Sequence, residues 1–333
     1  MSETKIVGVD IGYGFLKVFS EDKTVVIPSV IGNSVELTFE FRKGSDLKHI
    51  EVEYDGTKYF VGEMAILQST HPYRSLSVDR TNDIVTTVML LTGLALVSEE
   101  KEASFTVVTG LPVKDFTLFK QTYINTFSGK HTITVNGEKK TLHIKKVVVV
   151  PQPYGTFCDG LLKEDGEVDS NFAKNHVGII DIGYKTSDII QFDDLNYLER
   201  FSSTSANGIS SIYKDVSNYL STKHSIYKED YQLEECVQDG YLKIRNGIID
   251  LSEVIGEAKR SLAKKISTEV KSLWGNLPEV EVVIVTGGGG SLLHLELMEL
   301  LGDDVVLSPE PQIANVRGYW RWGVYLSEAE DVS

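Results

Sequence analysis

One short pattern occurs twice in the chain, and it limits the possible folds more than any other feature. Residues 6–13 read IVGVDIGY, and residues 177–184 read VGIIDIGY. Each copy is an apolar run that leads into an aspartate and a glycine turn, and a second apolar run follows, at residues 17–19 and 188–192. Because a strand, an acid, a tight turn and a second strand recur in the same order, we predict an internal duplication.

Other apolar runs predict the strands and helices among which the repeated pattern lies. Unbroken Val/Ile runs suit strands that are covered on both faces of a sheet, and the predicted runs are Lys5–Asp10, Lys145–Val150, His176–Asp181 and Val280–Thr286. Apolar residues at helical spacing predict helices at Asp83–Val97, Ile209–Leu220 and Leu251–Trp274. Strands that alternate with helices in this way indicate an α/β fold.

Turn residues predict two β-hairpins. Asp-Gly and Asn-Gly adopt the positive φ angles that tight hairpins need, and the predicted pairs are 50–54 with 58–61 through Asp55-Gly56, and 132–135 with 141–144 through Asn136-Gly137. Residues from about 30 to 70 alternate like strands, which indicates a small subdomain inserted in the first lobe. A chain of 333 residues without a long linker fits two domains that meet at a hinge.

The composition excludes several classes of protein. The hydrophobic share of 41% and the charged share of 24% are those of a globular protein, and the net charge of −15 opposes direct binding to nucleic acid. The first apolar run is too short for a signal peptide, and no run is long enough to cross a membrane. Cys158 and Cys236 have no metal-ligand spacing, so we expect reduced thiols in a cytoplasmic protein.

The repeated hairpin has the chemistry of a phosphate site. Gly12 and Gly14 leave backbone amides open to an anion, and successive amides in a turn form a concavity suited to phosphate. Asp10 would hold a magnesium ion through water, and Lys17 would reach the same phosphates. Taken singly, each feature has a plainer alternative, since an Asp-x-Gly sequence is often an ordinary turn and a single lysine is often a solvated one. Two such hairpins that face each other would hold a polyphosphate from both sides.

Two other phosphate motifs do not fit the sequence. Gly178–Thr186 resembles a P-loop, but Tyr184 stands between the second glycine and Lys185, so the required spacing is absent. A dinucleotide fingerprint would need a third glycine where Lys17 stands.

Four consecutive glycines follow the last predicted strand. Residues 287–290 lie between the apolar run at 280–285 and a helical pattern that begins at Leu292. Bare backbone there would let a base or a ribose lie flat, and the start of the helix favours a phosphate. The alternative is a flexible turn, although four glycines carry a large entropic cost for that purpose alone.

Together these motifs resemble those of the actin/Hsp70/sugar-kinase superfamily. The segments that carry the resemblance are Asp10-x-Gly12-x-Gly14-x-x-Lys17 (first phosphate motif), Val147–Gly155 (first hinge segment), Asp181-x-Gly183-x-x-Thr186-x-Asp188 (second phosphate motif), Val285–Gly289 (adenosine motif) and Ala314–Gly323 (second hinge segment). Within the superfamily, residues 109–113, the Pro151-Gln152 pair and the compact size are most similar to plasmid-segregation actins of the ParM/StbA type and to archaeal actins.

The resemblance implies a fold and its boundaries. We expect two RNase H-like lobes of the actin fold, with a nucleotide cleft between them and small inserted subdomains. Lobe I would span residues 1–165 with an insert at about 30–70, and residues 315–333 would return to it. Lobe II would span residues 166–314 with an insert at about 205–250.

The resemblance also implies the residues of the site. ATP, or alternatively GTP, would bind with Mg²⁺ in the cleft, where Asp10 and Asp181 would hold the metal through water and Asp181 would also be catalytic. The residues expected to contact the nucleotide are Asp10, Gly12, Tyr13, Gly14, Lys17, Gly183, Tyr184, Lys185, Thr186, Gly208, Gly287, Gly288, Gly289 and Gly290. Tyr13 stands where eukaryotic actin has a small hydroxyl residue, and Lys185 would either add a cation to the phosphate pocket or point to solvent.

Gln152 stands where the family has a glutamine or glutamate that orients a water, so we expect it to be catalytic. A neutral amide positions water but does not accept its proton, which fits phosphoryl transfer to water better than transfer to a metabolite. The alternative is that Gln152 only starts a helix between two prolines.

These expectations combine into one hypothesis, a filament-forming actin-like ATPase. Nucleotide would close the lobes, head-to-tail contacts that do not close a ring would form a helical filament, and hydrolysis would disassemble it. In the plasmid-partition group such filaments separate DNA through a DNA-bound adaptor, which suits an acidic protein. Two alternatives stay open: a small-molecule (sugar or acid) kinase of the same superfamily and a chaperone-like nucleotide switch, which is less favoured because we expect no peptide-binding domain.

Overall fold

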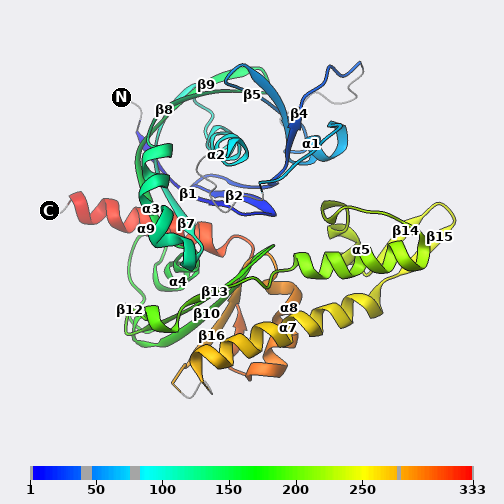
Figure 1. Ribbon diagram of the computed structural model, residues 1–333. Coiled ribbons are helices and arrows are strands. Elements are labelled where there is room, and N and C mark those ends of the chain that lie inside the picture. Colours follow the sequence, from blue (N-terminus) through cyan, green and yellow to red (C-terminus); the bar gives the residue numbers. More distant parts are fainter. Residues whose placement is uncertain (1–2, 39–46, 76–82, 276–278, 332–333) are drawn as a thin grey trace. The chain divides into compact units, whose positions relative to one another are not determined.

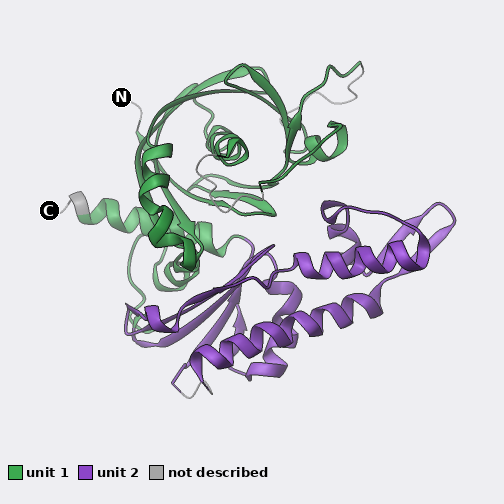
Figure 2. Ribbon diagram, in the orientation of Figure 1, with its two compact units in different colours: residues 1–173, 313–333 green, residues 174–312 purple. Residues whose placement is uncertain are grey.

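The computed structural model describes residues 3–38, 47–75, 83–275 and 279–331. The chain divides into two compact units (Figures 1 and 2), which are residues 1–173 with 313–333, called unit 1, and residues 174–312, called unit 2. Each unit is built from a β-sheet and helices, so the predicted α/β class is confirmed.

The sheet of unit 1 mixes parallel and antiparallel strands. In the order in which they pair, its strands are β3 (Thr24–Pro28), β2 (Phe15–Phe19), β1 (Thr4–Ile11), β7 (Glu102–Leu111), β9 (Glu138–Pro151), β8 (Gly129–Val135), β5 (Ile50–Tyr54), β6 (Thr57–Val61) and β4 (Ile31–Asn33). β1 pairs with β7 in parallel, and β7 pairs with β9 in parallel. Strands β4–β6 come from the region where the sequence predicts an insert, and they extend the same sheet because β5 pairs with β8.

Helix α2 (Ile84–Leu96) lies inside the curl of this sheet (Figure 1). It is apolar on every side, and most of its side chains are buried, as expected for a helix without a solvent face. Asp83 caps its first turn, and the buried Lys140 ammonium donates to the carbonyls of Ala95 and Ser98 near its last turn. Neither α2 nor any other described helix is both long and apolar enough to cross a membrane.

The other helices of unit 1 include one from the end of the chain. The helices are α1 (Glu63–Gln68), α3 (Val113–Phe127), α4 (Tyr154–Leu161) and α9 (Ala314–Asp331). The Arg317 guanidinium donates to both carboxylate oxygens of Asp159 on α4 at 2.6 Å, and the Thr156 hydroxyl donates to Asn315 Oδ1 at 2.7 Å. These contacts join α9 to α4, which explains why residues 313–333 belong to unit 1.

Unit 2 contains a second sheet and a set of helices. In the order in which they pair, its strands are β12 (Asn196–Tyr197), β11 (Ser187–Asp193), β10 (His176–Ile182), β16 (Val282–Thr286) and β17 (Val305–Leu307), and β13 (Ser203–Ser205) pairs with β11. Its helices are α5 (Ser210–His224), α6 (Glu234–Asp239), α7 (Ser252–Trp274) and α8 (Gly290–Leu301). Short 3-10 turns are η1 (Phe172–Lys174), which spans the unit boundary, η2 (Glu199–Phe201) and η3 (Asp230–Gln232).

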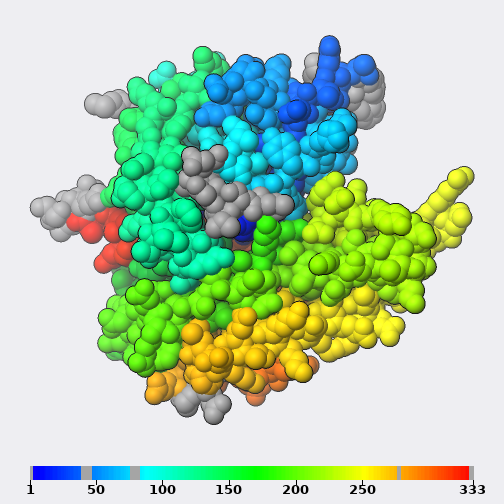
Figure 3. All heavy atoms as spheres, viewed as in Figure 1, coloured from blue at the N-terminus to red at the C-terminus, as the bar shows by residue number. Residues whose placement is uncertain are grey.

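A small hairpin lies between α6 and α7. Its strands, β14 (Tyr241–Ile244) and β15 (Gly247–Asp250), pair only with each other among the described strands. Leu242 and Ile249 are buried in the core of unit 2, whereas the tip of the hairpin projects outward (yellow in Figure 3).

The predicted strands, helices and hairpins are found, with differences in where some of them begin and end. Asp55 and Asn136 both have φ 49°, and each turn joins the predicted pair of strands. The separately predicted segments 141–144 and 145–150 form one strand, β9. A register shift between Phe105 and Thr106 of β7 leaves two consecutive lysines of β9 exposed, which interrupts the alternation of apolar residues.

Candidate functional site

The turn between β1 and β2 holds the first group of predicted site residues. The Gly12 amide donates to the Phe15 carbonyl at 2.9 Å, and Asp10 lies opposite Lys17 in the strand pair. The Lys17 ammonium is 2.8 Å from Asp10 Oδ2, and the two side chains are 12% and 3% exposed. Lys17 is therefore a partly buried ion-pair partner of the acid and not a lysine that extends into solvent.

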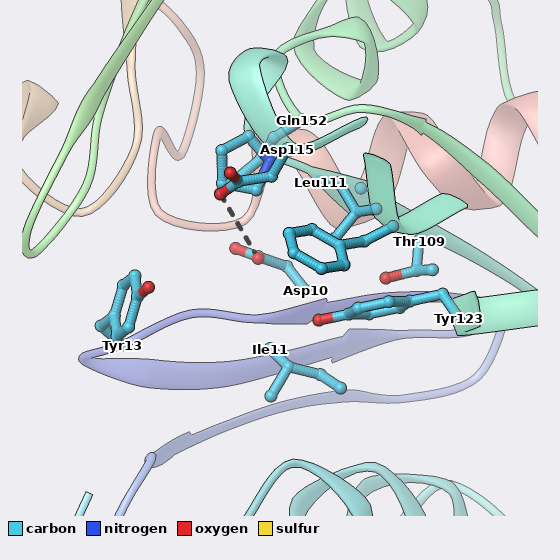
Figure 4. Close-up of a pocket in the computed structure, with 11 residues that line it drawn as sticks. Asp10, Ile11, Tyr13, Thr109, Leu111, Asp115, Tyr123 and Gln152 are labelled. Atoms are coloured by element: carbon cyan, nitrogen blue, oxygen red, sulfur yellow. Dashed lines mark hydrogen bonds between the residues drawn. The ribbon is translucent and has the colours of Figure 1, made fainter. Parts of the chain in front are cut away.

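Gln152 approaches the same acid from the connection between β9 and α4. Its Nε2 lies 3.4 Å from Asp10 Oδ1, and Figure 4 shows this contact as a dashed line. The Gln152 amide donates to the Leu111 carbonyl, and the Gln152 carbonyl accepts from the Tyr319 hydroxyl, each at 2.7 Å. Both backbone polar groups of Gln152 are thus hydrogen-bonded, which fixes the position from which its side-chain amide reaches Asp10.

A small pocket lies beside Asp10 and Gln152 (Figure 4). Its cavity volume is about 20 Å³, which is room for about one water molecule. Thr109 and Asp115 contribute polar groups to its lining, and the ring of Tyr123 contributes an apolar one. The pocket therefore has the size and polarity to place one water near an amide that can orient it.

Asp115 is a candidate residue that the sequence reasoning missed. It lies in the first turn of α3, and its amide donates to the Pro112 carbonyl at 2.9 Å. Burial raises the pKa of the Asp115 carboxyl, and the charge of Lys114 opposes this shift. The signal that could have found it is an acid three residues after a proline at the start of a helix.

Tyr13 and Gly14 complete the turn of the first hairpin. Tyr13 lines the pocket, although its side chain stands at the tip of the turn, apart from Asp10 and Gln152 (Figure 4). Gly14 is buried, and its carbonyl accepts from the Ser29 amide at 2.8 Å. Gly14 therefore has a structural role, and its contact with a ligand stays a prediction.

The strands β10 and β11 of unit 2 repeat this hairpin. Asp181 lies opposite Asp188 in the strand pair, and the Gly183 amide donates to the Thr186 carbonyl at 2.8 Å. The same pairing and the same turn hydrogen bond occur in β1 and β2. The duplication predicted from the sequence is therefore present in the backbone.

The second hairpin differs from the first in its charges. Asp181 and Asp188 are 3% and 2% exposed, and residues directly opposite in two strands share a face of the sheet. The Thr204 hydroxyl donates to Asp188 Oδ1. A divalent cation would relieve the repulsion between two such carboxylates.

The residues present fit a metal that keeps most of its water. Among the described residues, no group of three or more His, Cys, Asp or Glu side chains is arranged to hold a metal ion. Magnesium is commonly bound by one or two carboxylates, with waters and phosphate oxygens as the other ligands. The acid pair of Asp181 and Asp188 suits that kind of binding.

Two glycines of the run that follows β16 pack against the second hairpin. Gly287 has φ 82°, and a Cβ at this position would overlap Asp181 Oδ1. The Gly289 amide donates to the Ile182 carbonyl at 2.9 Å, and a Cβ there would overlap the Ile182 side chain. Close packing therefore explains why these two positions are glycine, and the sequence did not predict this.

The other two glycines differ from each other. Gly290 is buried and is the first residue of α8, so this helix begins before the predicted Leu292. Gly288 is exposed, and no atom lies within 4 Å of the place where its Cβ would be. Gly288 is the glycine of the run with open space for a ligand.

The remaining predicted residues lie together beside the second hairpin. Lys185 and Thr186 are partly buried in its turn, and Gly208 lies against the carbonyl of Tyr184. The Tyr184 hydroxyl donates to Asp230 Oδ2 at 2.8 Å. The side chain of Tyr184 is therefore directed to Asp230, and the contacts of these residues with a nucleotide stay predictions.

The predicted site residues thus form two groups, one in each unit. The group of unit 1 contains Asp10, Gly12, Tyr13, Gly14, Lys17 and Gln152. The group of unit 2 contains Asp181, Gly183, Tyr184, Lys185, Thr186, Gly208 and the glycines 287–290. A single site that uses both groups is a prediction.

Two family models match the chain. Residues 8–155 match the N-terminal domain of actin-like proteins, and residues 179–299 match the C-terminal domain of archaeal MreB-like actin homologues. Together these segments cover most of both units. No curated protein sequence matches the chain.

Solved structures of similar proteins share the fold over nearly the whole chain. A non-polymerisable quadruple mutant of pCBH ParM has 23% identity and a TM-score of 0.81, covering 96% of this chain and 99% of that one. ParM in a 15-stranded filament from Clostridium botulinum has 22% identity and a TM-score of 0.80, with coverages of 97% and 99%. The archaeal actin homologue Ta0583 in complex with ADP has 19% identity and a TM-score of 0.79, with coverages of 99% and 100%.

Proposed function

The chain belongs to the actin-like proteins, and on this premise we propose that it is an ATPase that assembles into filaments and disassembles them by hydrolysis. The observation that carries the proposal is the cluster of buried Asp10 with the partly buried Lys17 and Gln152, beside a pocket for one water. An acid, a cation and an amide that can orient water lie together at one glycine turn. Phosphoryl transfer uses groups of these three kinds.

Each side chain of this cluster has a proposed task, and that of Asp10 is the one expected from the sequence, which is to hold the water shell of Mg²⁺. The Lys17 ammonium, which neutralises Asp10 in the structure, would turn to the phosphates when ATP binds. Gln152 would orient the attacking water, since its backbone is held by Leu111 and Tyr319 and its amide is already aimed at the pocket.

Unit 2 would supply the remaining contacts. Asp181 and Asp188 would hold the water shell of Mg²⁺, which supplies charge neutralisation to the phosphates when bound. The exposed Gly288 would lie against the base or the ribose. We propose that Val147–Gly155 and Ala314–Gly323 form the hinge.

Assembly into filaments is proposed from the similarity to ParM. One similar structure is described as a ParM filament, and another as a non-polymerisable ParM mutant. Nucleotide would favour a closed shape that binds the next copy head to tail, and hydrolysis would weaken that contact. The net charge of −15 suits a cytoplasmic filament that moves plasmid DNA through a DNA-bound adaptor instead of touching DNA itself.

The experiment is light scattering after addition of ATP and Mg²⁺, with released phosphate measured in the same sample and electron microscopy at the maximum. We expect scattering to rise and then to fall as phosphate appears. A protein that releases phosphate without forming polymer at any concentration would contradict the assembly, and a protein that does neither would contradict the whole proposal.

For Gln152→Ala we expect phosphate release to slow by roughly tenfold to a hundredfold, because the water loses its orienting amide. Assembly should persist, since this side chain acts on the water. The check is phosphate release and scattering in parallel, with Gln121→Ala on the exposed face of α3 as the control. Normal turnover in Gln152→Ala would exclude the catalytic role.

A second function is favoured by one observation, the carboxyl of Asp115 in the same pocket. A small-molecule kinase needs a base beside the acceptor hydroxyl, and the carboxylate of Asp115 would be that base. Transfer of labelled phosphate from ATP to a sugar or an acid, in the absence of polymer, would support the kinase and exclude the filament ATPase.

A further inference from the structure

The second phosphate loop, residues 183–186, is hydrogen-bonded through its backbone to the start of α5. The Ser210 amide donates to the Tyr184 carbonyl at 2.8 Å, and the Ile209 amide donates to the Gly183 carbonyl at 3.1 Å. A Cβ at Gly208 would overlap the carbonyl of Tyr184, so the loop and α5 lie in close backbone contact. The loop therefore does not move independently of the segment that begins at residue 208.

The side chain of Tyr184 extends this attachment to a second segment. Its hydroxyl donates to Asp230 Oδ2 at 2.8 Å, and its ring lies 5.9 Å from the ring of Tyr213 on α5. The ring packs against the hydrophobic core of unit 2. A ligand-contacting role alone does not explain why this hydroxyl is directed to Asp230.

Asp230 is itself fixed in place. It begins η3, and Glu229 before it forms a reciprocal capping box with Gln232. Asp230 and Leu233 are bonded through their backbones, and α6 follows directly. A hydrogen bond from the loop to Asp230 therefore connects the loop to the whole segment that leads into α6.

We propose that Tyr184 and Asp230 are a positioning pair, which fixes the second phosphate loop in its binding conformation and joins it to the segment 226–240. Nucleotide held by the loop then restrains this segment, and loss of nucleotide releases it. The proposal depends on the proposed function for the identity of its ligand. The hydroxyl bonded to a carboxylate is the stronger kind of hydrogen bond, so its removal has a measurable effect.

The first test measures affinity for ADP and for a non-hydrolysable ATP analogue by calorimetry, at concentrations without polymer. Tyr184→Phe removes only the hydroxyl, and we expect roughly tenfold weaker binding. Asp230→Ala should give the same loss, and the double variant should be no weaker than either single variant, because both remove one interaction. Asp230→Asn, which keeps an acceptor oxygen but not its charge, should give a smaller loss of roughly threefold.

The matched control is Tyr227→Phe, which removes a hydroxyl from an 83% exposed tyrosine in the same segment. It should bind nucleotide like the wild type. Independent losses that multiply in the double variant would overturn the proposal, as would unchanged affinity in Tyr184→Phe.

The second test measures hydrogen exchange in residues 226–240 with and without ADP. In the wild type we expect ADP to slow exchange there, and in Tyr184→Phe we expect no slowing even at saturating ADP. Equal protection in both proteins would overturn the proposal. If the wild type binds no adenine nucleotide, the proposed function fails. The positioning pair is then tested without ligand. Faster hydrogen exchange of residues 226–240 in Tyr184→Phe than in the wild type supports the pair, and equal exchange overturns it.

Discussion

The hairpin of β1 and β2 and the hairpin of β10 and β11 have the same backbone and opposite chemistry. Both place an aspartate opposite the residue seven positions later, and both close their turn with a hydrogen bond from a glycine amide. In the first hairpin the opposite residue is Lys17, and in the second it is Asp188. The two hairpins share their geometry, and the residue opposite the aspartate gives them different charges.

This difference assigns different tasks to the two hairpins. Asp10 is neutralised by a lysine 2.8 Å away, so the first hairpin carries a cation that phosphate would attract. Asp181 lies opposite another buried carboxylate, so we propose that the second hairpin binds a cation. We infer that unit 1 mainly binds phosphate and unit 2 mainly binds the metal.

The largest effect that tests this division is expected for Asp181→Ala. Loss of the acid proposed to hold the metal should lower the rate of hydrolysis by roughly a hundredfold or more, while some nucleotide binding and any filaments persist. Phosphate release and scattering are the measurements. Asp193→Ala, at the exposed end of the same hairpin, is the control and should act like the wild type. Wild-type turnover in Asp181→Ala would refute its role.

The next largest effect is expected for Lys17→Met. Removal of the cation leaves Asp10 buried without its ion-pair partner, so the free energy of unfolding should fall by about 3 kcal/mol. Urea unfolding measures this change, and Lys23→Met, at an exposed lysine after the same strand, should change it by less than about 0.5 kcal/mol. The double variant Asp10→Asn with Lys17→Met should recover part of the loss, and a loss that does not recover would argue against charge as its cause.

A smaller effect separates packing from ligand contact in the glycine run. Gly287→Ala should lower the free energy of unfolding by about 2 kcal/mol, because its φ is 82° and its Cβ would meet Asp181. Gly288→Ala is the matched control, with open space around its Cβ, and should leave stability unchanged while it weakens nucleotide binding. Urea unfolding and calorimetry measure the two quantities. Equal losses of stability would show that the two glycines do not differ.

The smallest effect concerns the pH dependence that Asp115 adds. Burial raises the pKa of its carboxyl in the folded protein above 3.8. As the pH rises past 3.8, this carboxyl therefore loses its proton in the unfolded chain before it does so in the folded protein. Ionisation then favours the unfolded chain, so the free energy of unfolding decreases. At neutral pH, Asp115→Asn should be more stable than the wild type by about 0.3 kcal/mol, since solvent screens this partly exposed group. Urea unfolding at pH 3 and pH 7 checks this, with the exposed Asp22→Asn as the control. If Asp115→Asn gains the same stability at pH 3 as at pH 7, the charge of the carboxyl is not the cause of the gain.

Much of the local structure follows from the sequence because its causes are local. The turns at Asp55 and Asn136 form because these residues accept φ 49°, and Asp83 starts α2 by accepting from the amide two residues on. The predicted strand at 176–181 is β10, because an unbroken apolar run suits a strand covered on both faces.

The contacts that make the site were not predictable in the same way. Gln152 and Asp10 are separated by 142 positions in the chain, and their contact depends on the parallel pairing of β1, β7 and β9. Asp115 enters the pocket only because α3 starts beside the ends of β7 and β9. No local pattern records which strands become neighbours.

The sequence by itself determined the duplicated hairpin, the α/β class and the identity of most groups that meet at the turns, since turn chemistry and apolar periodicity act over a few residues. The tertiary structure alone decided the partners of those groups: Lys17 with Asp10, Gly287 with Asp181, and Tyr184 with Asp230. The physical reason is that charge compensation and close packing depend on distance in space, and the folding of the whole unit sets that distance.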